Sequence, residues 1–273
     1  MPTRRMLAGS CLAALLALHV ISDARAQAPE PAIAIMQKRG AMLVGMATFV
    51  PWAMRNEQGQ LVGFEVDVAT KLAKDLDLKL ELVPTAWDGV IPALLAGKFD
   101  VIIGGMTITA KRNLTVNFSA PYDYAGTSLA IAKRLQPGFK PELLNDTRMT
   151  IACRRGATSC INVMEYFPKA TLRQFDDDAA ITQELLNGNV DAFAASEPLP
   201  SRVAAENPDK VAAPLTQAQE LNRLPAGMAV RKGDADTLNV LNNWIQANTT
   251  FLQARRHYWF ETQDWRTAVG KVN

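Results

Sequence analysis

Residues 104–112 read Gly-Gly-Met-Thr-Ile-Thr-Ala-Lys-Arg and follow the apolar run Phe-Asp-Val-Ile-Ile of residues 99–103. The apolar run has the length of a buried strand, and two glycines after it let the backbone turn and approach another group closely. Thr107 and Arg112 then supply a hydroxyl and a guanidinium, which suit a small carboxylate because the guanidinium presents a planar fork of donors. A strand, a turn and a solvated arginine are the simpler alternative, and the surrounding sequence has to distinguish the two.

The composition is that of a soluble globular protein long enough for two domains. The chain has 273 residues, of which 48% are hydrophobic and 21% charged, values outside the disordered and membrane classes. Its net charge of +2 falls to zero if residues 1–26 are removed, because that segment holds three arginines and one aspartate. A neutral protein has no electrostatic reason to bind nucleic acid or anionic lipid, so neither is predicted as a partner.

Residues 1–26 have the organisation of a secretory signal peptide. A basic start is followed by an apolar stretch over residues 6–21, too short and glycine-interrupted to span a membrane comfortably. The small-x-small sequence at residues 24–26 predicts cleavage after Ala26 and export to the periplasm. Two arginines near the start leave open the choice between the general and the twin-arginine export routes. Since no later segment reaches transmembrane length, the mature chain is expected to be soluble.

Hydrophobic periodicity predicts the same α/β pattern twice. Apolar runs of strand length alternate with amphipathic stretches of helical period, and Gln-Pro-Gly at residues 136–138 interrupts the pattern before it restarts. Alternating strands and helices favour an open, mostly parallel sheet with flanking helices. The predicted elements before this break are 41–46, 66–76, 79–83, 89–96, 99–103 and 128–132. Those after it are 150–153, 159–167, 171–175, 179–187, 190–195, 197–206, 227–230 and 236–250.

Two such halves predict a two-lobed protein. Lobe 1 is expected to comprise residues 27–131 and 225–273, and lobe 2 residues 132–224. A cleft between two lobes is a common place for a ligand. Since extended segments join the halves, hinge closure around the ligand is expected as well.

Cys153 and Cys160 are the two cysteines that remain after residue 26. Outside the cytoplasm, a pair seven residues apart could form a disulfide that holds the turn at residues 154–159, and two buried thiols are the alternative. Because the chain has no Cys-x-x-Cys sequence, a redox role is not predicted.

Neither a metal site nor a cofactor site is predicted. Three aspartates at residues 176–178 precede a predicted helix, so helix capping explains them better than a metal cluster does. His257 is the single histidine after residue 26 and lies in an aromatic tail. Triads and metal sites that need histidines are therefore disfavoured, and neither Gly-x-Ser-x-Gly nor a phosphate loop occurs.

Six further motifs follow one another along the chain: Gly-Phe-Glu-Val-Asp-Val at 63–68, Trp-Asp-Gly-Val-Ile-Pro-Ala-Leu at 87–94, Phe-Ser-Ala-Pro-Tyr at 118–122, Arg-Gly-Ala-Thr-Ser at 155–159, Val-Asp-Ala-Phe at 190–193 and Ala-Val-Arg-Lys-Gly at 229–233. With residues 104–112, their order and spacing resemble the family 3 periplasmic solute-binding proteins, which serve ABC importers of polar amino acids. The resemblance covers nearly the whole mature chain. It implies a monomeric binding protein without cofactor or enzymatic activity, which closes over a small carboxylate solute, a polar amino acid or a derivative, and delivers it to an inner-membrane ABC permease.

The resemblance also implies a ligand site. Arg112 matches the family arginine that pairs with the ligand's α-carboxylate, with help from Thr107 and the backbone of Gly105. Two aromatic residues match the walls that sandwich the ligand, although both could be core residues. Two residues of the second lobe match positions that touch the ligand. The aromatic pair is Phe49 and Trp87, and the second-lobe pair is Arg154 and Thr158.

The chain departs from the family where the ligand's ammonium group would bind. Most amino-acid binders of the family carry an aspartate five residues after the position of Asp191, and here that residue is Ser196, followed by Glu197. Serine has no charge to balance a buried ammonium group. Three explanations are open: Glu197 replaces the aspartate after a local shift, another acid such as Asp123 does so, or the ligand is an organic acid without an α-ammonium group.

An exported enzyme is the alternative function, because cyclohexadienyl dehydratases resemble these binding proteins. Such an enzyme needs a general acid in the cleft. The position of the acid in that family falls on Leu199 here, so the binding function is preferred.

Overall fold

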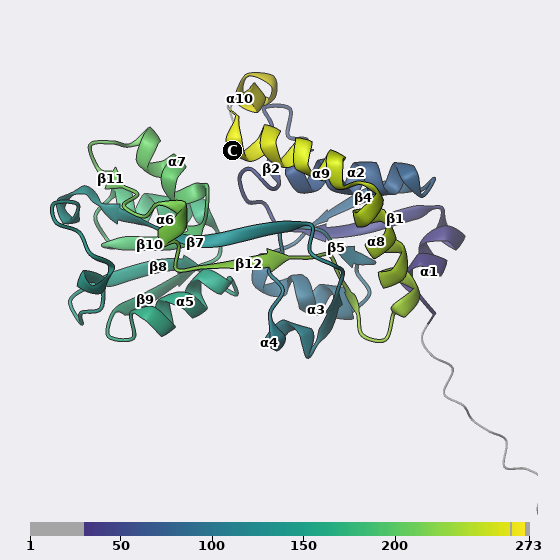
Figure 1. The fold of residues 1–273 in the computed structure, drawn as a ribbon, viewed down its shortest axis with the longest axis horizontal. Coiled ribbons are helices and arrows are strands. Elements are labelled where there is room, and N and C mark those ends of the chain that lie inside the picture. Colours follow the sequence, from purple (N-terminus) through teal and green to yellow (C-terminus); the bar gives the residue numbers. More distant parts are fainter. Residues whose placement is uncertain (1–29, 263, 271–273) are drawn as a thin grey trace, which may run out of the picture.

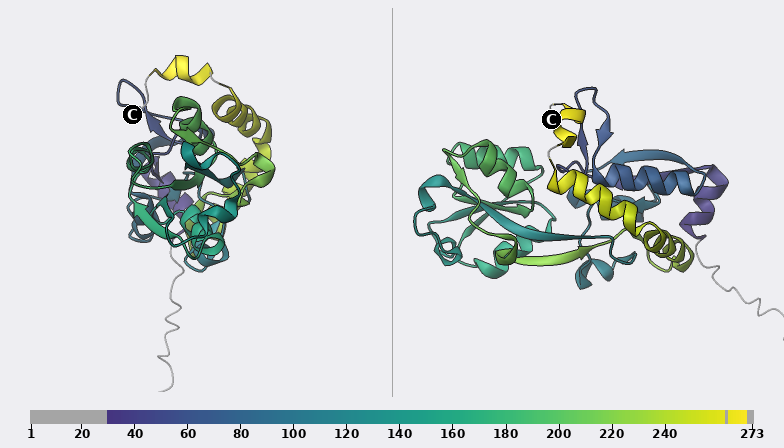
Figure 2. Two further views of the ribbon diagram at one scale, coloured as in Figure 1. Left: turned by 90° about the vertical axis from the view of Figure 1, so that its left-hand side faces the viewer. Right: turned by 45° about the horizontal axis from the view of Figure 1, so that its top comes forward.

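The computed structural model describes residues 30–262 and 264–270. The predicted signal peptide and its cleavage after Ala26 lie outside these residues. Within them, no helix has the length and apolar character needed to cross a membrane. The elements form two groups that lie side by side along the long axis of the molecule (Figures 1 and 2).

The first group contains a five-stranded sheet. Its strands are β1 (Ala41–Met46), β4 (Lys79–Pro84), β5 (Val101–Ile102), β6 (Val116–Phe118) and β13 (Ala229–Arg231), in the order β4-β1-β5-β13-β6, with a separate hairpin of β2 (Met54–Arg55) and β3 (Leu61–Val62). β1 is parallel to β4 and β5, whereas β13 is antiparallel to β5 and β6. The helices of this group are α1 (Ala32–Arg39), α2 (Phe64–Asp75), η1 (Trp87–Gly89), α3 (Val90–Leu95), α4 (Ala110–Asn113), α8 (Ala235–Ala247), α9 (Thr249–Arg256), η5 (His257–Glu261) and α10 (Asp264–Val269).

The second group contains a six-stranded sheet. Its strands are β7 (Asp123–Ala132), β8 (Thr150–Arg154), β9 (Thr171–Phe175), β10 (Ala192–Ser196), β11 (Val211–Ala212) and β12 (Asn222–Ala226), in the order β11-β7-β10-β8-β9, with β12 also paired to β7. β8 is parallel to β9 and β10, and β7 is antiparallel to β10, β11 and β12. The helices are η2 (Lys133–Leu135), η3 (Pro141–Leu144), α5 (Thr158–Tyr166), α6 (Asp178–Leu186), α7 (Leu199–Glu206) and η4 (Gln217–Gln219).

The two sheet regions make the two-lobed α/β fold that the sequence predicts, and each sheet is mixed, with three parallel strands continued by antiparallel ones. β7 and β12 run from one lobe to the other as an antiparallel pair, in register from Ala226 opposite Asp123 to Asn222 opposite Thr127 (Figure 1). Two paired strands form a narrow connection, which is the geometry of a hinge. The exact boundaries of the lobes stay a prediction.

Each sheet has an apolar cluster on both faces. In the first lobe, α1, α2, α8 and α9 supply one cluster, and α3 with Trp87 supplies the other. In the second lobe, α6 and α7 supply one cluster and α5 the other. β1 is buried at almost every position, as expected for a strand covered on both faces. This burial explains why its sequence is a continuous apolar run.

The predicted residue ranges agree with the structure closely for the central strands and less closely for the hinge and the chain ends. β1, β8 and β9 match the predicted ranges within one residue, whereas α1, α9 and β12 are not predicted. β7 begins at Asp123, five residues before the predicted strand at residues 128–132, because its polar first half pairs with β12. That pairing joins segments about a hundred residues apart, so local sequence carries little signal for it.

Candidate functional site

The loop after β5 places Arg112 at the junction of the two lobes. The side chain of Thr109 accepts a hydrogen bond from the backbone N of Arg112 (3.2 Å) and so caps α4. The Arg112 guanidinium donates to the carbonyl oxygen of Thr107 in the first lobe (2.9 Å) and to that of Gly156 in the second (2.9 Å). Arg112 therefore bridges the lobes through backbone carbonyl groups.

Gly105 lets this loop pass against the indole of Trp52. Its φ of +65° lies in the left-handed region, which glycine adopts without steric penalty. A Cβ at this position would lie 2.8 Å from Cδ1 of Trp52. The glycine noted in the sequence is thus required by both the backbone angle and the close approach.

Two aromatic residues of the first lobe face a guanidinium of the second. Phe49 stacks on Trp52, with ring centroids 4.3 Å apart and planes at 3°. The Cζ atom of Arg154 lies 4.7 Å from the Phe49 centroid and 5.0 Å from the Trp87 centroid, and Cζ of Arg112 lies 5.7 Å from the same Trp87 ring. Trp87 is thus in contact with both guanidinium groups, at distances typical of cation–π interactions.

Arg154 is the last residue of β8 and is held on several sides. The preceding residue, Cys153, forms a disulfide with Cys160 (Cα–Cα 5.4 Å) across the turn that carries Arg154. Its Nη1 atom donates to the carbonyl oxygen of Thr48 in the first lobe (3.2 Å) and lies 3.1 Å from Oδ2 of Asp178 at the start of α6. Its Nε atom is buried and has no hydrogen-bond partner among the described residues. Arg154 therefore has one buried N–H donor that is not used in a hydrogen bond.

Further contacts show that the lobes are in close approach here. Oγ1 of Thr107 lies 3.4 Å from Oγ1 of Thr158, within hydrogen-bonding distance across the cleft. Gly156 lies against Asp88, since a Cβ on Gly156 would lie 3.1 Å from the Asp88 Cα atom. The structure thus brings together six residues of the predicted site, from both lobes: Phe49, Trp87, Thr107, Arg112, Arg154 and Thr158.

The electrostatics of this cluster are dominated by positive charge. Burial, and to a smaller extent the charge of the neighbouring Arg154, lower the pKa of Arg112 to about 10. Arg112 still carries its charge at neutral pH. Burial raises the pKa of Asp178, while the charge of Arg154 opposes that rise. A ligand that brings negative charge would relieve the repulsion between the two arginines.

Two cavities flank the stacked residues in the cleft, and both are of a size that suits a small solute. One, of about 290 Å³, is lined by Ala47, Thr48, Pro84, Thr85, Ala86, Trp87, Arg154, Asp176 and Asp177. The other, of about 490 Å³, is lined by Thr48, Phe49, Val50, Ala53, Met54, Asp177, Asp178, Ala179, Thr182, Gln183, Leu199, Arg202, Val203 and Glu206. The predicted aromatic walls therefore border open space as well as the core.

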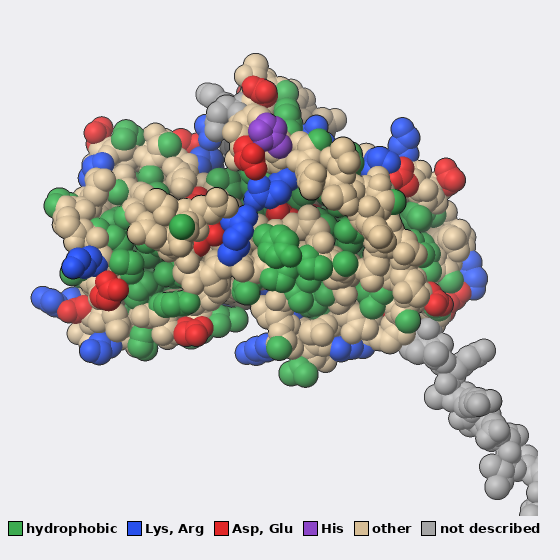
Figure 3. All heavy atoms as spheres, in the orientation of Figure 1, with side chains coloured by type: hydrophobic (Ala, Val, Ile, Leu, Met, Phe, Trp, Pro, Cys, Tyr) green, Lys and Arg blue, Asp and Glu red, His purple; other side chains and the backbone are tan. Residues whose placement is uncertain are grey.

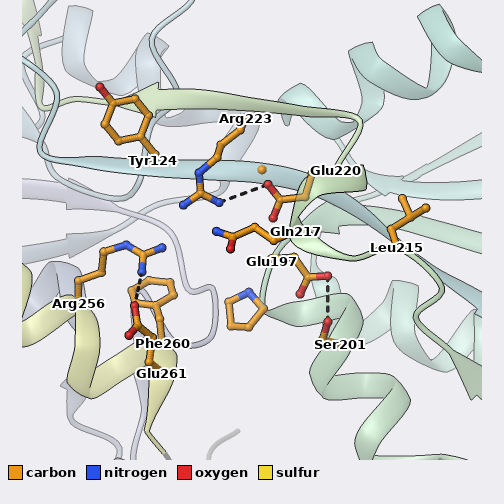
Figure 4. Close-up of a pocket in the computed structure, with 12 residues that line it drawn as sticks. Tyr124, Glu197, Ser201, Leu215, Gln217, Glu220, Arg223, Arg256, Phe260 and Glu261 are labelled. Carbon is orange, nitrogen blue, oxygen red and sulfur yellow. Dashed lines mark hydrogen bonds and ion pairs between the residues drawn. The ribbon is translucent and has the colours of Figure 1, made fainter.

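Glu197 is directed away from this cluster. It lines a separate cavity of about 320 Å³ between the hinge strands, α7 and the C-terminal helices, together with Glu220, Arg223 and Arg256 (Figure 4). The Ser201 hydroxyl donates to its carboxylate (3.0 Å), and burial raises its pKa. The explanation in which Glu197 replaces the family aspartate therefore does not fit this arrangement.

Ser196 and Asp123 have different surroundings. Ser196 ends β10, two residues beyond Ala194, which is opposite Cys153 in the parallel strand β8, so Ser196 lies at the same sheet edge as Arg154. Asp123 is buried at the start of β7 and accepts a hydrogen bond from Nε of Arg256 (2.7 Å). Because Asp123 is already paired with Arg256, it does not serve as a substitute acid in the cleft.

Asp178 is the cleft residue that the sequence prediction assigned a different role. The prediction treated residues 176–178 as helix caps, and Asp177 does cap α6 by accepting a hydrogen bond from the backbone N of Ala180 (2.7 Å). Asp178 instead faces Arg154 and lines the larger cavity. The available sequence signal for this role was Arg154 itself, because a buried guanidinium needs an acidic partner.

The described residues contain no group of three or more histidine, cysteine, aspartate or glutamate side chains placed to hold a metal ion. On the face shown in Figure 3, basic and acidic side chains lie interspersed. Such a surface lacks the one-sided basic patch that favours nucleic acid.

Comparison with known proteins places this chain in a family. The model of the bacterial extracellular solute-binding proteins, family 3, matches residues 42–262. The L-cystine-binding protein TcyJ of Escherichia coli (strain K12) is 30% identical over 233 residues, which cover 82% of this chain and 84% of that protein. The cyclohexadienyl dehydratase of Pseudomonas aeruginosa is 26% identical over 269 residues, covering 94% and 96%. The crystal structure of the ancestral amino acid-binding protein AncCDT-1, a precursor of cyclohexadienyl dehydratase, is 36% identical with a TM-score of 0.76, covering 85% of this chain and 100% of that one.

The chain therefore belongs to the family 3 bacterial extracellular solute-binding proteins. Its relatives include proteins named as cystine-, histidine- and glutamine-binding proteins. The family resemblance stated from the sequence motifs is confirmed, while the roles of the individual site residues stay predictions.

Proposed function

We propose that this protein is the periplasmic binding component of an ABC importer and closes over a small carboxylate-bearing solute, of which a polar amino acid is the reference case in the family. The observation that carries the proposal is the cluster of Arg112, Arg154 and Trp87. Guanidinium groups from both lobes meet at one indole ring. A carboxylate between the lobes would gain charge-assisted hydrogen bonds from the closed form that the open form cannot supply. Ligand binding would thus shift the equilibrium towards closure.

Calorimetry on the purified mature protein with a panel of amino acids and organic acids tests this function. Arg112→Ala is expected to weaken binding of any carboxylate ligand by at least about 100-fold, because a charge-assisted bidentate contact is lost. Lys111→Ala is the matched control, since Lys111 is an exposed neighbour on the same short helix, and it should leave affinity unchanged. The proposal fails if no small carboxylate binds, or if Arg112→Ala binds as tightly as the wild type.

We infer further that the protein is not an enzyme. Leu199 occupies the position predicted for the dehydratase acid, and it is 2% exposed and lines the larger cavity. An apolar side chain there supplies no proton for a leaving group. Turnover of prephenate or arogenate by the purified protein would contradict this inference.

The partner and the location are part of the same proposal. A monomer with residues 1–26 removed would diffuse in the periplasm and dock on an inner-membrane ABC permease, as the family membership suggests. N-terminal sequencing of the exported protein should begin at Gln27, and a start at another residue would exclude cleavage after Ala26. Gel filtration should give the mass of one chain.

A further inference from the structure

Arg154 occupies the space between the two aromatic walls of the cleft. Its guanidinium lies 4.7 Å from the centroid of Phe49 and 5.0 Å from that of Trp87. A pair of aromatic faces is a favourable site for a cation, and here the protein fills that site with its own cation. A ligand with a cationic side chain would have to displace Arg154 and would meet the charges of two arginines.

The two arginines of the cluster have few acidic partners. Arg112 has no acidic partner among the described residues, and its guanidinium donates to two backbone carbonyl groups. Arg154 is 7% exposed and has one neighbouring acid, Asp178. The adjacent Asp176 is paired with Arg155 (3.0 Å), and Asp177 caps α6. Of the three aspartates at residues 176–178, Asp178 alone is within ion-pair distance of Arg154, and no acid of the described residues is within that distance of Arg112.

Three groups that the sequence suggested for an ammonium group do not provide a carboxylate at this cluster. Ser196 stands at the family's aspartate position without a charge, Glu197 lines the separate cavity of Figure 4, and Asp123 is paired with Arg256. A buried ammonium without a carboxylate would carry a large desolvation penalty. An ammonium group in the cleft would therefore depend on Asp177 or Asp178, which line the larger cavity.

Arg154 also has an unused donor. Its Nε atom is buried without a hydrogen-bond partner, and Oδ2 of Asp178, although 3.1 Å from Nη1, is not aligned for a hydrogen bond. A buried donor without an acceptor is unfavourable. A second carboxylate could accept from Nε and from one Nη of Arg154 in the bidentate geometry that guanidinium groups favour.

We propose that the ligand is a small dicarboxylate, with one carboxylate at Arg112 and the second at Arg154, and that Arg154 determines this specificity by excluding cationic side chains. The inference rests on the proposed binding function and narrows its ligand class. An acidic amino acid and a dicarboxylic acid without an amino group share this chemistry, and the probes below distinguish the two.

Calorimetry with four probes of similar length tests the ligand class: glutarate, glutamate, glutamine and lysine. Glutarate or glutamate should bind at least 10-fold more tightly than glutamine, and lysine should bind more weakly than either. A preference for glutarate means that an amino group is not required, and a preference for glutamate means that an acid such as Asp178 contacts it. Equal or tighter binding of glutamine or lysine would overturn the dicarboxylate proposal.

Variants test the role of Arg154 separately. Arg154→Leu should reduce affinity for the dicarboxylate at least 10-fold while changing glutamine affinity less than 3-fold, and Arg154→Lys should restore part of the loss. Arg173→Leu is the matched control, because Arg173 also stacks on an aromatic ring (5.0 Å to Phe175) and pairs with an acid (2.7 Å to Glu184), but on β9. It should leave all affinities unchanged.

The outcomes separate the two proposals. Suppose that glutamine or lysine binds tightly, that Arg112→Ala abolishes this binding and that Arg154→Leu does not change it. The binding function would then be retained, and the dicarboxylate ligand class would be overturned. Absence of binding by every probe and every member of the wider panel would overturn both. Urea unfolding of each variant shows that a lost affinity is not a lost fold.

Discussion

At the scale of single residues, Glu65 in α2 is a titratable group shielded from water. It is completely buried, and its Oε2 atom accepts a hydrogen bond from the hydroxyl of Tyr122 (2.7 Å). Its pKa is raised to about 8, chiefly by burial and also by the charge of Asp123, while the hydrogen bond from Tyr122 opposes the rise. At neutral pH the folded protein therefore holds Glu65 mainly in its neutral form.

This burial predicts a pH dependence of stability. In the unfolded chain Glu65 ionises near its ordinary pKa of 4.5, so between about pH 4.5 and 8 the folded state binds more protons than the unfolded state. The free energy of unfolding should therefore fall as pH rises through this window, by on the order of a few kcal/mol from this group.

Urea unfolding at several pH values measures the effect. Glu65→Gln should flatten the dependence, because the amide keeps the shape and cannot ionise. Glu165→Gln, at an exposed position of α5, should leave the dependence as in the wild type. An unchanged pH profile in Glu65→Gln would show that the carboxyl group is ionised in the folded protein.

At the scale of elements, the disulfide between Cys153 and Cys160 joins the end of β8 to the start of α5. It closes the turn that carries Arg154 and Gly156, and both residues make contacts to the first lobe. The bond restricts the unfolded chain and fixes the end of the strand in the folded one. The position of Arg154 between the aromatic rings thus depends on a covalent constraint as well as on packing.

Removal of this constraint should weaken both stability and binding. The double variant Cys153→Ala/Cys160→Ala is expected to lose about 2 kcal/mol of unfolding free energy, the lower part of the usual range, because the closed loop is short. Glutarate affinity should fall as well, since Arg154 gains freedom. Reductant should lower the urea midpoint of the wild type and leave that of the double variant unchanged. Equal midpoints for wild type and variant would contradict the prediction.

At the scale of the whole molecule, the lobes contact each other at Gly156, where a side chain would lie too close to the opposite lobe. Gly156 has a φ of +75°, and a Cβ there would lie 3.1 Å from the Cα atom of Asp88 in the first lobe. Its carbonyl oxygen accepts from Arg112 across the cleft. A side chain at position 156 would therefore disturb the contact between the lobes more than the fold of either lobe.

Gly156→Ala should impair closure. Gly188→Ala is the matched control, because Gly188 is in the same lobe at a φ of +76° with open space around its Cβ position. Both variants carry the strain of a left-handed alanine, about 1 kcal/mol, but only Gly156→Ala should lower ligand affinity, by about 5-fold or more. It should also reduce the ligand-induced compaction seen by small-angle X-ray scattering. Equal affinities in the two variants would show that this contact does not limit closure.

The sequence alone determined the class of fold and the positions of the central strands, and it predicts residues 104–112 as a carboxylate-binding loop. These features follow from local rules: β1 is a continuous apolar run because both faces of its sheet are covered, and Gly105 is required by a left-handed turn. The resemblance of the motifs to family 3 binding proteins likewise follows from short stretches, and the match over residues 42–262 confirms it.

The tertiary structure decided which charged groups share the cleft. Local sequence treats Asp178 as a capping residue and Glu197 as a neighbour of Ser196, but the fold places Asp178 against Arg154 and turns Glu197 into a separate cavity behind the hinge. Local sequence does not predict the pairing of β12 with β7 either, because that pairing joins segments distant in sequence. Local patterns report the faces of strands and helices, whereas the partner of a buried charge is set by which lobe folds against it. For that reason the loop at residues 104–112 predicts one carboxylate contact, and the position of Arg154 between Phe49 and Trp87 is the basis for proposing a second.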